Sequence, residues 1–195
     1  FVKEAVIKAI KEGKTKYTAV DGIVELKDAV IRKLERDNQL SYQRNEIIVS
    51  SGGKHSIYNL LSAWLNPGDE VVIPAPYWVS YPDMTKLVGA TPVIQAGIDQ
   101  RFKITAEQLR GALTDKTRLM FINSPSNPAG TAYTAEELKA LADVLRDYPN
   151  VLIATDDMYE HILWSDSPFA NLPMVAPDLK DRTVILTGVS KAYAM

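Results

Sequence analysis

The sequence predicts an α/β fold in which helices sandwich a mainly parallel sheet. Short apolar runs typical of buried strands alternate with segments whose apolar residues recur at helical spacing. Strands that alternate with helices are joined by crossover connections, which make the strands parallel and cover both faces of the sheet. The chain contains no internal repeat, low-complexity tract or linker, so one compact domain is expected over residues 1–195.

Helices are predicted from apolar spacing and from start and stop signals. Val2, Val6 and Ile10 share a face of the first predicted helix, and Leu26 and Val30 share a face of the second. Pairs of a threonine and a Glu or Gln three residues later form capping boxes, in which side chain and backbone bond each other at a helix start. Further helices are expected from His55 to Leu65, over 81–89, and after the capping boxes Thr105 to Gln108 and Thr134 to Glu137.

Strands are predicted where apolar, often β-branched residues form short runs bounded by turn residues. Six segments carry this pattern: 46–49 (EIIV), 70–74 (EVVIP), 91–96 (TPVIQA), 118–125 (RLMFINSP), 151–157 (VLIATDD) and 183–188 (TVILTG).

Composition narrows the class of function. A formal net charge of -2 gives no broad basic surface, which argues against nucleic-acid or anionic-membrane partners. The chain has no cysteine and only two histidines, His55 and His161, so a disulfide framework or a zinc site is not expected. No apolar run approaches the ~20 residues of a membrane-spanning helix. We therefore expect a cytoplasmic protein that handles small molecules and needs no metal.

Functional side chains are expected where the predicted strands end, because ligands of open parallel sheets bind beyond the carboxyl ends of the strands. The segments that follow the strands supply glycines at a helix start, an aromatic ring, an amide, a carboxylate and an amine. This combination suits a flat, anionic ligand that bears a carbonyl group. The segments are 51–54 (SGGK), Tyr77 and Trp78, 124–130 (SPSNPAG), 156–159 (DDMY), and Ser190 and Lys191.

Each of these features also has an ordinary structural explanation. Gly52 and Gly53 precede a helix and could present free backbone N–H groups to a phosphate, or could simply form a tight turn. Trp78 could stack on a ligand ring or belong to the core. Asn127 lies in an Asn-Pro sequence that favours a turn with or without a ligand.

The carboxylate and the amine are less easily explained by structure alone. Asp156 should emerge from a buried strand and need a cationic partner, although it could also cap the following segment, with Asp157 free to take the other role. Tyr159 could be an ordinary core tyrosine. An arbitrary lysine more often extends its amine to solvent along an apolar surface. Lys191 follows an apolar run, so its amine is expected to be partly desolvated, and such an amine becomes a nucleophile for carbonyl carbons.

Taken together, the motifs SSGGK, PAPYWVSYPDM, NSPSNPAG, TDDMYEH and GVSKAYAM resemble the pyridoxal-phosphate-dependent aminotransferases of fold type I. The resemblance is closest to the bacterial aspartate aminotransferases, a group that includes aspartate/prephenate aminotransferases. It covers essentially the whole chain in the family's order and spacing, which makes it far more specific than any single motif.

The resemblance implies a role for each site residue. Lys191 would bind pyridoxal 5'-phosphate as a Schiff base and act as general base, and Asp156 would pair with the pyridine nitrogen. Asn127 and Tyr159 would hydrogen-bond the phenolic oxygen, and Trp78 would stack on the ring.

The same resemblance implies the phosphate and substrate contacts. The backbone amides of Gly53 and Lys54 would hold the phosphate, and Gly52 and Ser190 complete the predicted cofactor set. The Lys54 side chain would meet the distal carboxylate of a dicarboxylic substrate, beside Trp78 and Asn127. Tyr17 would reach the phosphate of a neighbouring subunit, which implies a homodimer.

The sequence departs from the family pattern in two ways. Ala129 stands where many members have threonine, a change expected to affect loop packing only. The chain also lacks the family's N-terminal arm, the last strand of the sheet, the arginines for phosphate and substrate carboxylate, and the C-terminal small domain. We therefore expect residues 1–195 to be part of a large cofactor-binding domain and to be inactive in isolation.

Three functions remain open at this point. The leading one is transamination between aspartate or glutamate and a 2-oxo acid. A second keeps the fold with another specificity, for prephenate, aromatic amino acids or alanine, or with a lyase reaction. A third is a non-catalytic aminotransferase-like sensor domain.

Overall fold

The computed structural model describes residues 1–98 and 101–195, which form two compact units, Phe1–Ser50 and Ser51–Met195. We refer to them as the N-terminal unit and the sheet unit. Every predicted site residue except Tyr17 lies in the sheet unit. The assignment of both units to one large domain remains a prediction.

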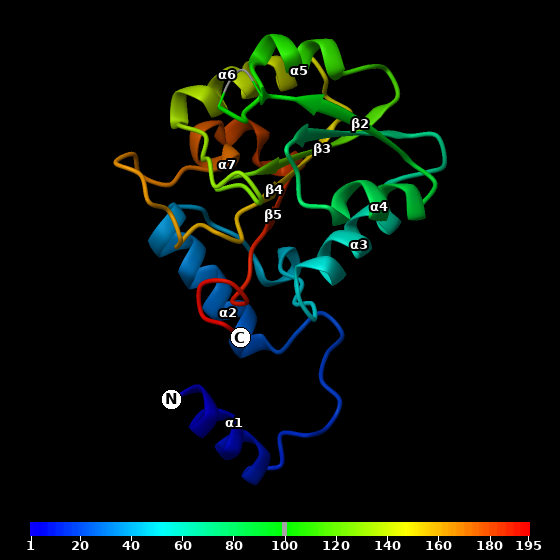
Figure 1. The fold of residues 1–195 in the computed structure, drawn as a ribbon. Helices are drawn as coiled ribbons and strands as arrows, with labels where there is room; N and C mark the ends of the chain where they lie inside the picture. Colours follow the sequence, from blue (N-terminus) through cyan, green and yellow to red (C-terminus); the bar gives the residue numbers. More distant parts are fainter. Residues whose placement is uncertain (99–100) are drawn as a thin grey trace. The chain divides into compact units, whose positions relative to one another are not determined.

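The sheet unit contains a five-stranded sheet in the order β2-β1-β3-β4-β5, and every pairing is parallel (Figure 1). The predicted α/β class and the five strand predictions within this unit are therefore confirmed. The strands are β1 (Glu70–Ala75), β2 (Thr91–Ala96), β3 (Thr117–Asn123), β4 (Leu152–Asp156) and β5 (Thr183–Leu186).

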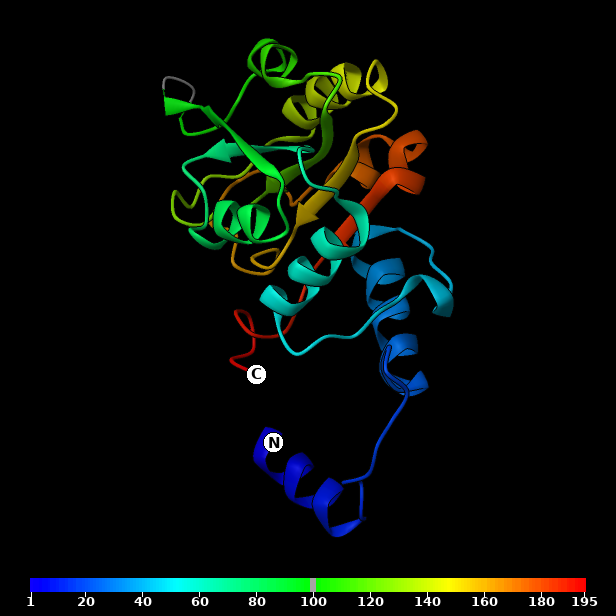
Figure 2. The same cartoon turned by 90° about the vertical axis from the view of Figure 1, so that its right-hand side faces the viewer.

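Helices cover both faces of this sheet, as Figures 1 and 2 show. Phe121 of β3 belongs to the apolar cluster under α3 and α4, whereas Met120 and Ile122 belong to the cluster under α5, α6 and α7. Alternate side chains of one strand thus enter two separate cores, which explains why the central strands are apolar throughout. The helices are α3 (Gly53–Trp64), α4 (Ser80–Leu87), α5 (Ala106–Ala112), α6 (Ala135–Arg146), α7 (Leu172–Val175) and the 3₁₀ segment Pro177–Arg182.

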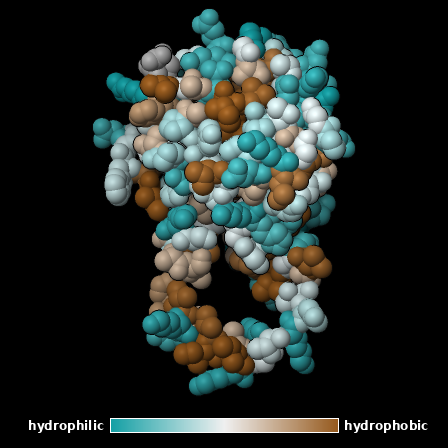
Figure 3. All heavy atoms as spheres, turned by 45° about the vertical axis from the view of Figure 1, so that its right-hand side comes forward, coloured by the Kyte–Doolittle hydropathy of each residue, from teal (hydrophilic) through white to brown (hydrophobic). Residues whose placement is uncertain are grey.

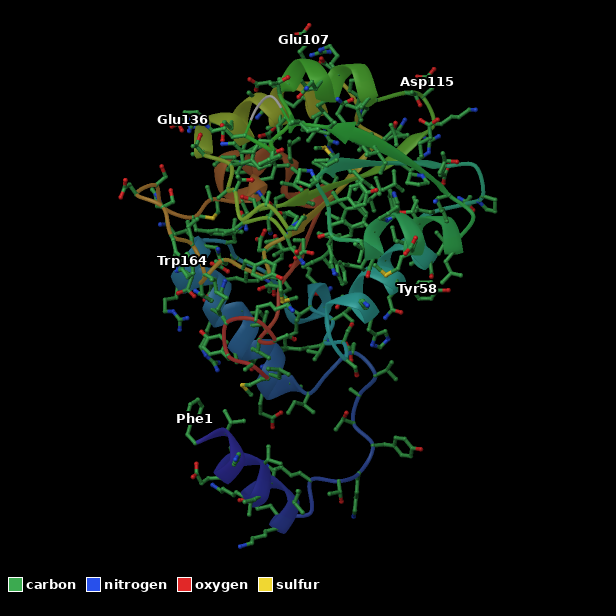
Figure 4. The ribbon with its side chains drawn as sticks, viewed as in Figure 1. Phe1, Tyr58, Glu107, Asp115, Glu136 and Trp164 are labelled. Atoms are coloured by element: carbon green, nitrogen blue, oxygen red, sulfur yellow. The ribbon has the colours of Figure 1, made fainter. Side chains whose placement is uncertain are left out.

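The two predicted capping boxes are both present. Thr134 Oγ1 accepts a hydrogen bond from the Glu137 amide at 3.2 Å, and the Glu137 carboxylate accepts one from the Thr134 amide at 2.7 Å. Thr105 and Gln108 make the same pair of bonds at 3.2 and 2.9 Å. Figure 4 shows Glu136 pointing away from the sheet at the start of α6, as the amphipathic pattern requires.

The N-terminal unit consists of helices and loops. Its elements are α1 (Val2–Lys11), α2 (Val24–Lys33), a π-helical segment Leu34–Asn38 and a 3₁₀ segment Arg44–Glu46. The predicted apolar face of α1 is real, but none of its side chains is buried. Figure 3 shows hydrophobic atoms gathered over α1 at the bottom of that view.

One strand prediction is wrong. Residues 46–49 form no strand: a 3₁₀ turn ends at Glu46, and the chain that follows is irregular. Apolar character allows a strand but does not supply a partner, and no strand is described within residues 1–50. In the described ranges 1–98 and 101–195, no helix is long and apolar enough to cross a membrane.

Candidate functional site

The predicted site residues of the sheet unit lie in the segments near the carboxyl ends of the parallel strands. Asn123 ends β3 and Asp156 ends β4, and the two residues are register partners in adjacent strands. Asn123 Nδ2 donates a hydrogen bond to the Asp156 carbonyl at 2.9 Å. The strand ends therefore form a continuous polar edge, as the fold class predicts.

Asp156 is a buried carboxylate held by neutral donors. Its side chain accepts hydrogen bonds from the Tyr81 hydroxyl at 2.5 Å and from the Met158 amide at 3.2 Å, and 7% of the residue is exposed. Burial raises the pKa of this carboxyl, and the Tyr81 and Met158 hydrogen bonds partly oppose that rise. The sequence predicted a cationic partner for Asp156. Among the described residues, no cation pairs with this carboxylate. The Met158 bond also supports the capping alternative.

Aromatic side chains connect Asp156 to the start of α3. The rings of Tyr81 and Phe121 are stacked with centroids 4.4 Å apart, and the rings of Tyr81 and Trp78 meet edge to face at 5.5 Å. The Lys54 amine lies 5.4 Å from the Trp78 ring centroid, within range of a cation–π contact. Lys54, Trp78, Tyr81 and Asp156 therefore form one series of contacts.

The loop after β3 is held by the strand end. Asn123 Oδ1 accepts a hydrogen bond from the Asn127 amide at 2.8 Å, which fixes the backbone of Asn127. The Asn127 side-chain amide makes no hydrogen bond within the described residues and is half-buried. It is therefore available to a ligand at this edge.

The glycines at the start of α3 meet the predicted requirements of an anion site. Gly52 has a φ of 93°, in the region that favours glycine, and no side chain caps the helix. A Cβ on Gly53 would lie 3.1 Å from Met158 Cε, so a larger residue would press on the loop after β4. Free N–H groups at such a helix start favour an anion.

Asp157 has a structural role. Thr155 Oγ1 and Asn171 Nδ2 donate hydrogen bonds to its carboxylate at 2.6 and 2.7 Å, and 2% of the residue is exposed. Burial raises the pKa of Asp157 to about 7, with the nearby Glu160 and Asp156 carboxylates raising it further and the two hydrogen bonds opposing. The two adjacent aspartates are thus distinct: Asp157 joins β4 to α7, and Asp156 faces the strand-end edge.

The loop that carries Lys191 contacts the loop after β4 on both sides of the lysine. A Cβ on Gly188 would lie 3.1 Å from both Met158 Sδ and Met158 Cε, and the rings of Tyr193 and His161 lie 6.1 Å apart. The prediction of a partly desolvated Lys191 is wrong, because the residue is exposed and forms no hydrogen bond or ion pair in the part of the chain that the structure describes. The apolar run before it belongs to β5, which ends at Leu186, and nothing described covers the loop beyond.

The remaining predicted residues are less constrained. Tyr159 is half-buried in the loop after β4, three residues after Asp156. Ser190 is exposed beside Lys191. Tyr17 is fully exposed in the loop between α1 and α2 of the N-terminal unit.

Two residues of the site were missed from sequence. Tyr81 and Asn123 make the hydrogen bonds that hold Asp156 and Asn127, yet neither was singled out. A signal existed only for Asn123, which is a polar residue at the end of an apolar strand. Tyr81 is 75 residues from Asp156, and no spacing rule connects them.

Chemically, this edge offers an anion site at a helix start, an aromatic face, a free amide, a buried carboxylate and an exposed amine. These groups are chemically complementary to a flat, anionic ligand. A sequence model of the aminotransferase class I and II family matches residues 1–195, and the chain belongs to that family.

The chain is similar to several individual aminotransferases. The chain is 57% identical over 195 residues to the aspartate/prephenate aminotransferase of Nitrosomonas europaea and 54% identical to that of Cereibacter sphaeroides, covering all of this chain and 49% of each relative. The crystal structure of the aspartate aminotransferase from Rhizobium meliloti matches with a TM-score of 0.97 and 47% identity, over all of this chain and 49% of that one. An aromatic aminotransferase from Pyrococcus horikoshii matches with a TM-score of 0.94 and 33% identity, over 52% of its chain. The chain thus spans about half the length of the relatives it matches.

Proposed function

We propose that the protein containing this chain catalyses transamination between aspartate or glutamate and a 2-oxo acid with pyridoxal 5'-phosphate. The observation that carries the proposal is the Asp156 carboxylate, which is buried at a strand end and bonded only to neutral donors. A protonated pyridine nitrogen is the kind of partner that such a carboxylate lacks. Because the chain covers about half of its relatives, the activity is assigned to the whole protein.

The described residues fit this cofactor. The start of α3 offers free N–H groups of Gly53 and Lys54 for a phosphate, and a half-buried Trp78 offers a ring for stacking. The unbonded Asn127 amide and the Tyr159 hydroxyl are donors for a phenolic oxygen. Gly52 and Ser190 complete the set that would hold the group.

When bound, pyridoxal phosphate supplies an aldehyde that receives the amino group and a ring that accepts electrons from the substrate α-carbon. Asp156 would hold the proton on the ring nitrogen, which keeps the ring electron-poor. The Lys191 amine would anchor the group and, once displaced by the substrate amine, would take the proton from the α-carbon. Trp78 would hold the ring plane and exclude water from one face.

The acidic substrate class is supported by Lys54. Its amine lies beside the Trp78 ring, so a carboxylate on a substrate stacked there would find a cation within reach. The names of the relatives from Nitrosomonas europaea and Cereibacter sphaeroides also support aspartate, and prephenate is the second acceptor to examine.

We also propose a homodimer. The exposed apolar face of α1 and the exposed Tyr17 would be buried against a second copy, which is the physical reason for apolar side chains at such positions. A cytoplasmic location remains a prediction from the sequence.

The test is an amino-transfer assay on the full-length protein loaded with pyridoxal phosphate. We expect aspartate and 2-oxoglutarate to give glutamate, with a lower kcat/KM for alanine or phenylalanine as donor. A preference for an aromatic donor would replace the proposed specificity, and the absence of transfer with every donor would contradict the proposed activity.

A further inference from the structure

We infer that Tyr81 is a positioning residue: its hydroxyl fixes the Asp156 carboxylate, and its ring supports Trp78. One side chain of α4 would thus set both the contact to the cofactor's ring nitrogen and the contact to its ring face. The inference rests on the proposed function and deepens it.

The hydrogen bond to Asp156 sets the direction of the carboxylate. Tyr81 donates to Oδ2 at 2.5 Å, while the Met158 amide holds Oδ1 at 3.2 Å. The two donors come from different parts of the chain, so together they fix both oxygens and hence the plane of the group. Without the hydroxyl, only the amide bond at one oxygen would remain.

The neutral character of this donor matters as much as its position. A lysine or arginine at this place would neutralise Asp156 and remove the reason for a cationic ligand to bind. A phenol orients the carboxylate and leaves its negative charge uncompensated. Asp156 therefore stays available for the proton on a ligand nitrogen.

Tyr81 is itself held rigidly, which a positioning residue requires. Its ring stacks on Phe121 with an interplanar angle of 19° and a centroid distance of 4.4 Å, and 2% of the residue is exposed. Thr85 Oγ1 bonds the Tyr81 carbonyl at 2.8 Å, one turn along α4. Phe121 belongs to β3, so the sheet core determines where the hydroxyl points.

The edge-to-face contact with Trp78 extends this support to the ring predicted to stack on the cofactor. The two centroids are 5.5 Å apart at an interplanar angle of 88°. Because Trp78 also contacts Lys54, a shift of Tyr81 would move three of the proposed cofactor and substrate contacts together. Tyr81 thus bonds Asp156 through its hydroxyl and contacts Trp78 through its ring.

The experiment measures pyridoxal phosphate affinity of the full-length apoprotein by fluorescence, for wild type, Tyr81→Phe and Tyr133→Phe. Tyr133 is the matched control, because it is also buried and its hydroxyl accepts a hydrogen bond from the Ile104 amide at 2.9 Å. We expect Tyr81→Phe to weaken affinity about tenfold, the loss of one hydrogen bond to a charged group. Tyr133→Phe should lower Tm without changing the affinity.

A double-mutant cycle with Asp156→Asn separates positioning from general packing. If Tyr81 acts through the carboxylate, Tyr81→Phe should change the affinity less than about twofold once Asp156 is Asn. In the loaded enzyme, Tyr81→Phe should lower kcat for aspartate and leave its KM nearly unchanged, because the hydroxyl does not touch the substrate.

The outcomes distinguish the inference from the function on which it rests. Wild-type affinity in Tyr81→Phe, or an equal loss in the Asp156→Asn background, would overturn the positioning role while leaving the proposed function intact. A wild-type protein that does not bind pyridoxal phosphate would overturn both.

Discussion

The loops after β4 and β5 differ sharply, although both follow buried parallel strands at the same edge of the sheet. After β4, Asp156 and Asp157 are buried and every carboxylate oxygen accepts a hydrogen bond. After β5, Lys191 is exposed and bonds to none of the described residues. The fold therefore holds Asp156, the proposed partner of the ring nitrogen, without a ligand. It leaves Lys191, the proposed anchor, unbonded.

The difference has an energetic reason. A buried carboxylate without donors costs several kcal/mol, so its oxygens must be satisfied by the fold itself. An exposed amine carries no such cost, and its position can be fixed later by a bond to a ligand. In the proposed enzyme, the buried carboxylate of Asp156 would orient the cofactor and the exposed amine of Lys191 would react with it.

The largest expected effect is a loss of activity without a loss of stability at Lys191. Lys191→Ala should lower kcat about 10⁴-fold, the upper range for a general base, and should change the free energy of unfolding of the apoprotein by less than about 0.5 kcal/mol. Lys86→Ala, another exposed lysine, is the control and should change neither. If Lys191→Ala kept a rate within tenfold of wild type, the proposed role of Lys191 in the reaction would be contradicted.

Asp156 should show the next largest effect on rate. Asp156→Asn should lower kcat about 10²–10³-fold, because a neutral amide cannot hold the ring proton. The Tm of the apoprotein should stay equal or rise, since the amide can bond both the Tyr81 hydroxyl and the Met158 amide without burying a charge. A kcat within tenfold of wild type would contradict the proposed role of the carboxylate, whereas a fall in Tm by more than a few degrees would show that it also stabilises the fold.

The pH dependence of stability should depend on Asp157. Its pKa is raised from 3.8 to about 7, so between about pH 4 and pH 7 the folded state holds a proton that the unfolded state has released. The unfolding free energy should therefore fall as pH rises through this window, by up to ~1.4 kcal/mol for each pH unit.

Asp157→Asn should flatten that dependence, because an amide does not titrate and can still accept from Asn171 and donate to Thr155. Denaturant unfolding of the apoprotein at several pH values measures the slope. An equal slope in wild type and variant would show that Asp157 does not cause it.

The smallest expected effect is one on stability, at the start of α6. Thr134→Ala removes the side-chain acceptor at the start of α6 and should destabilise the protein by about 1 kcal/mol, without changing kcat. Thr134→Ser keeps the hydroxyl and should stay close to wild type. A loss of activity in Thr134→Ala would show that the start of α6 is coupled to the site.

Much of the sheet unit could be predicted because local patterns agreed with the tertiary structure. The capping boxes at Thr105 and Thr134 and the apolar runs of five strands each indicated the element that formed. The strand prediction for residues 46–49 was wrong, because an apolar run indicates that burial is favourable but does not indicate that a partner strand is present.

The site was predictable in its parts and not in its contacts. The position of Asp156 could be predicted, because a polar residue at the end of a buried parallel strand faces the edge where ligands bind. Its bond to Tyr81 depends on where α4 packs on β3, which no local pattern specifies. The exposure of Lys191 was misjudged because the apolar run ends with β5 at Leu186, five residues before the amine.

The most direct test of the central claim is borohydride reduction of the full-length protein with pyridoxal phosphate, followed by peptide mass mapping. Borohydride converts a bond between a lysine amine and the cofactor aldehyde into a stable one. We predict one modified residue per chain, Lys191. Modification of Lys54 instead, or scattered modification of surface lysines, would contradict the claim that Lys191 is the anchor.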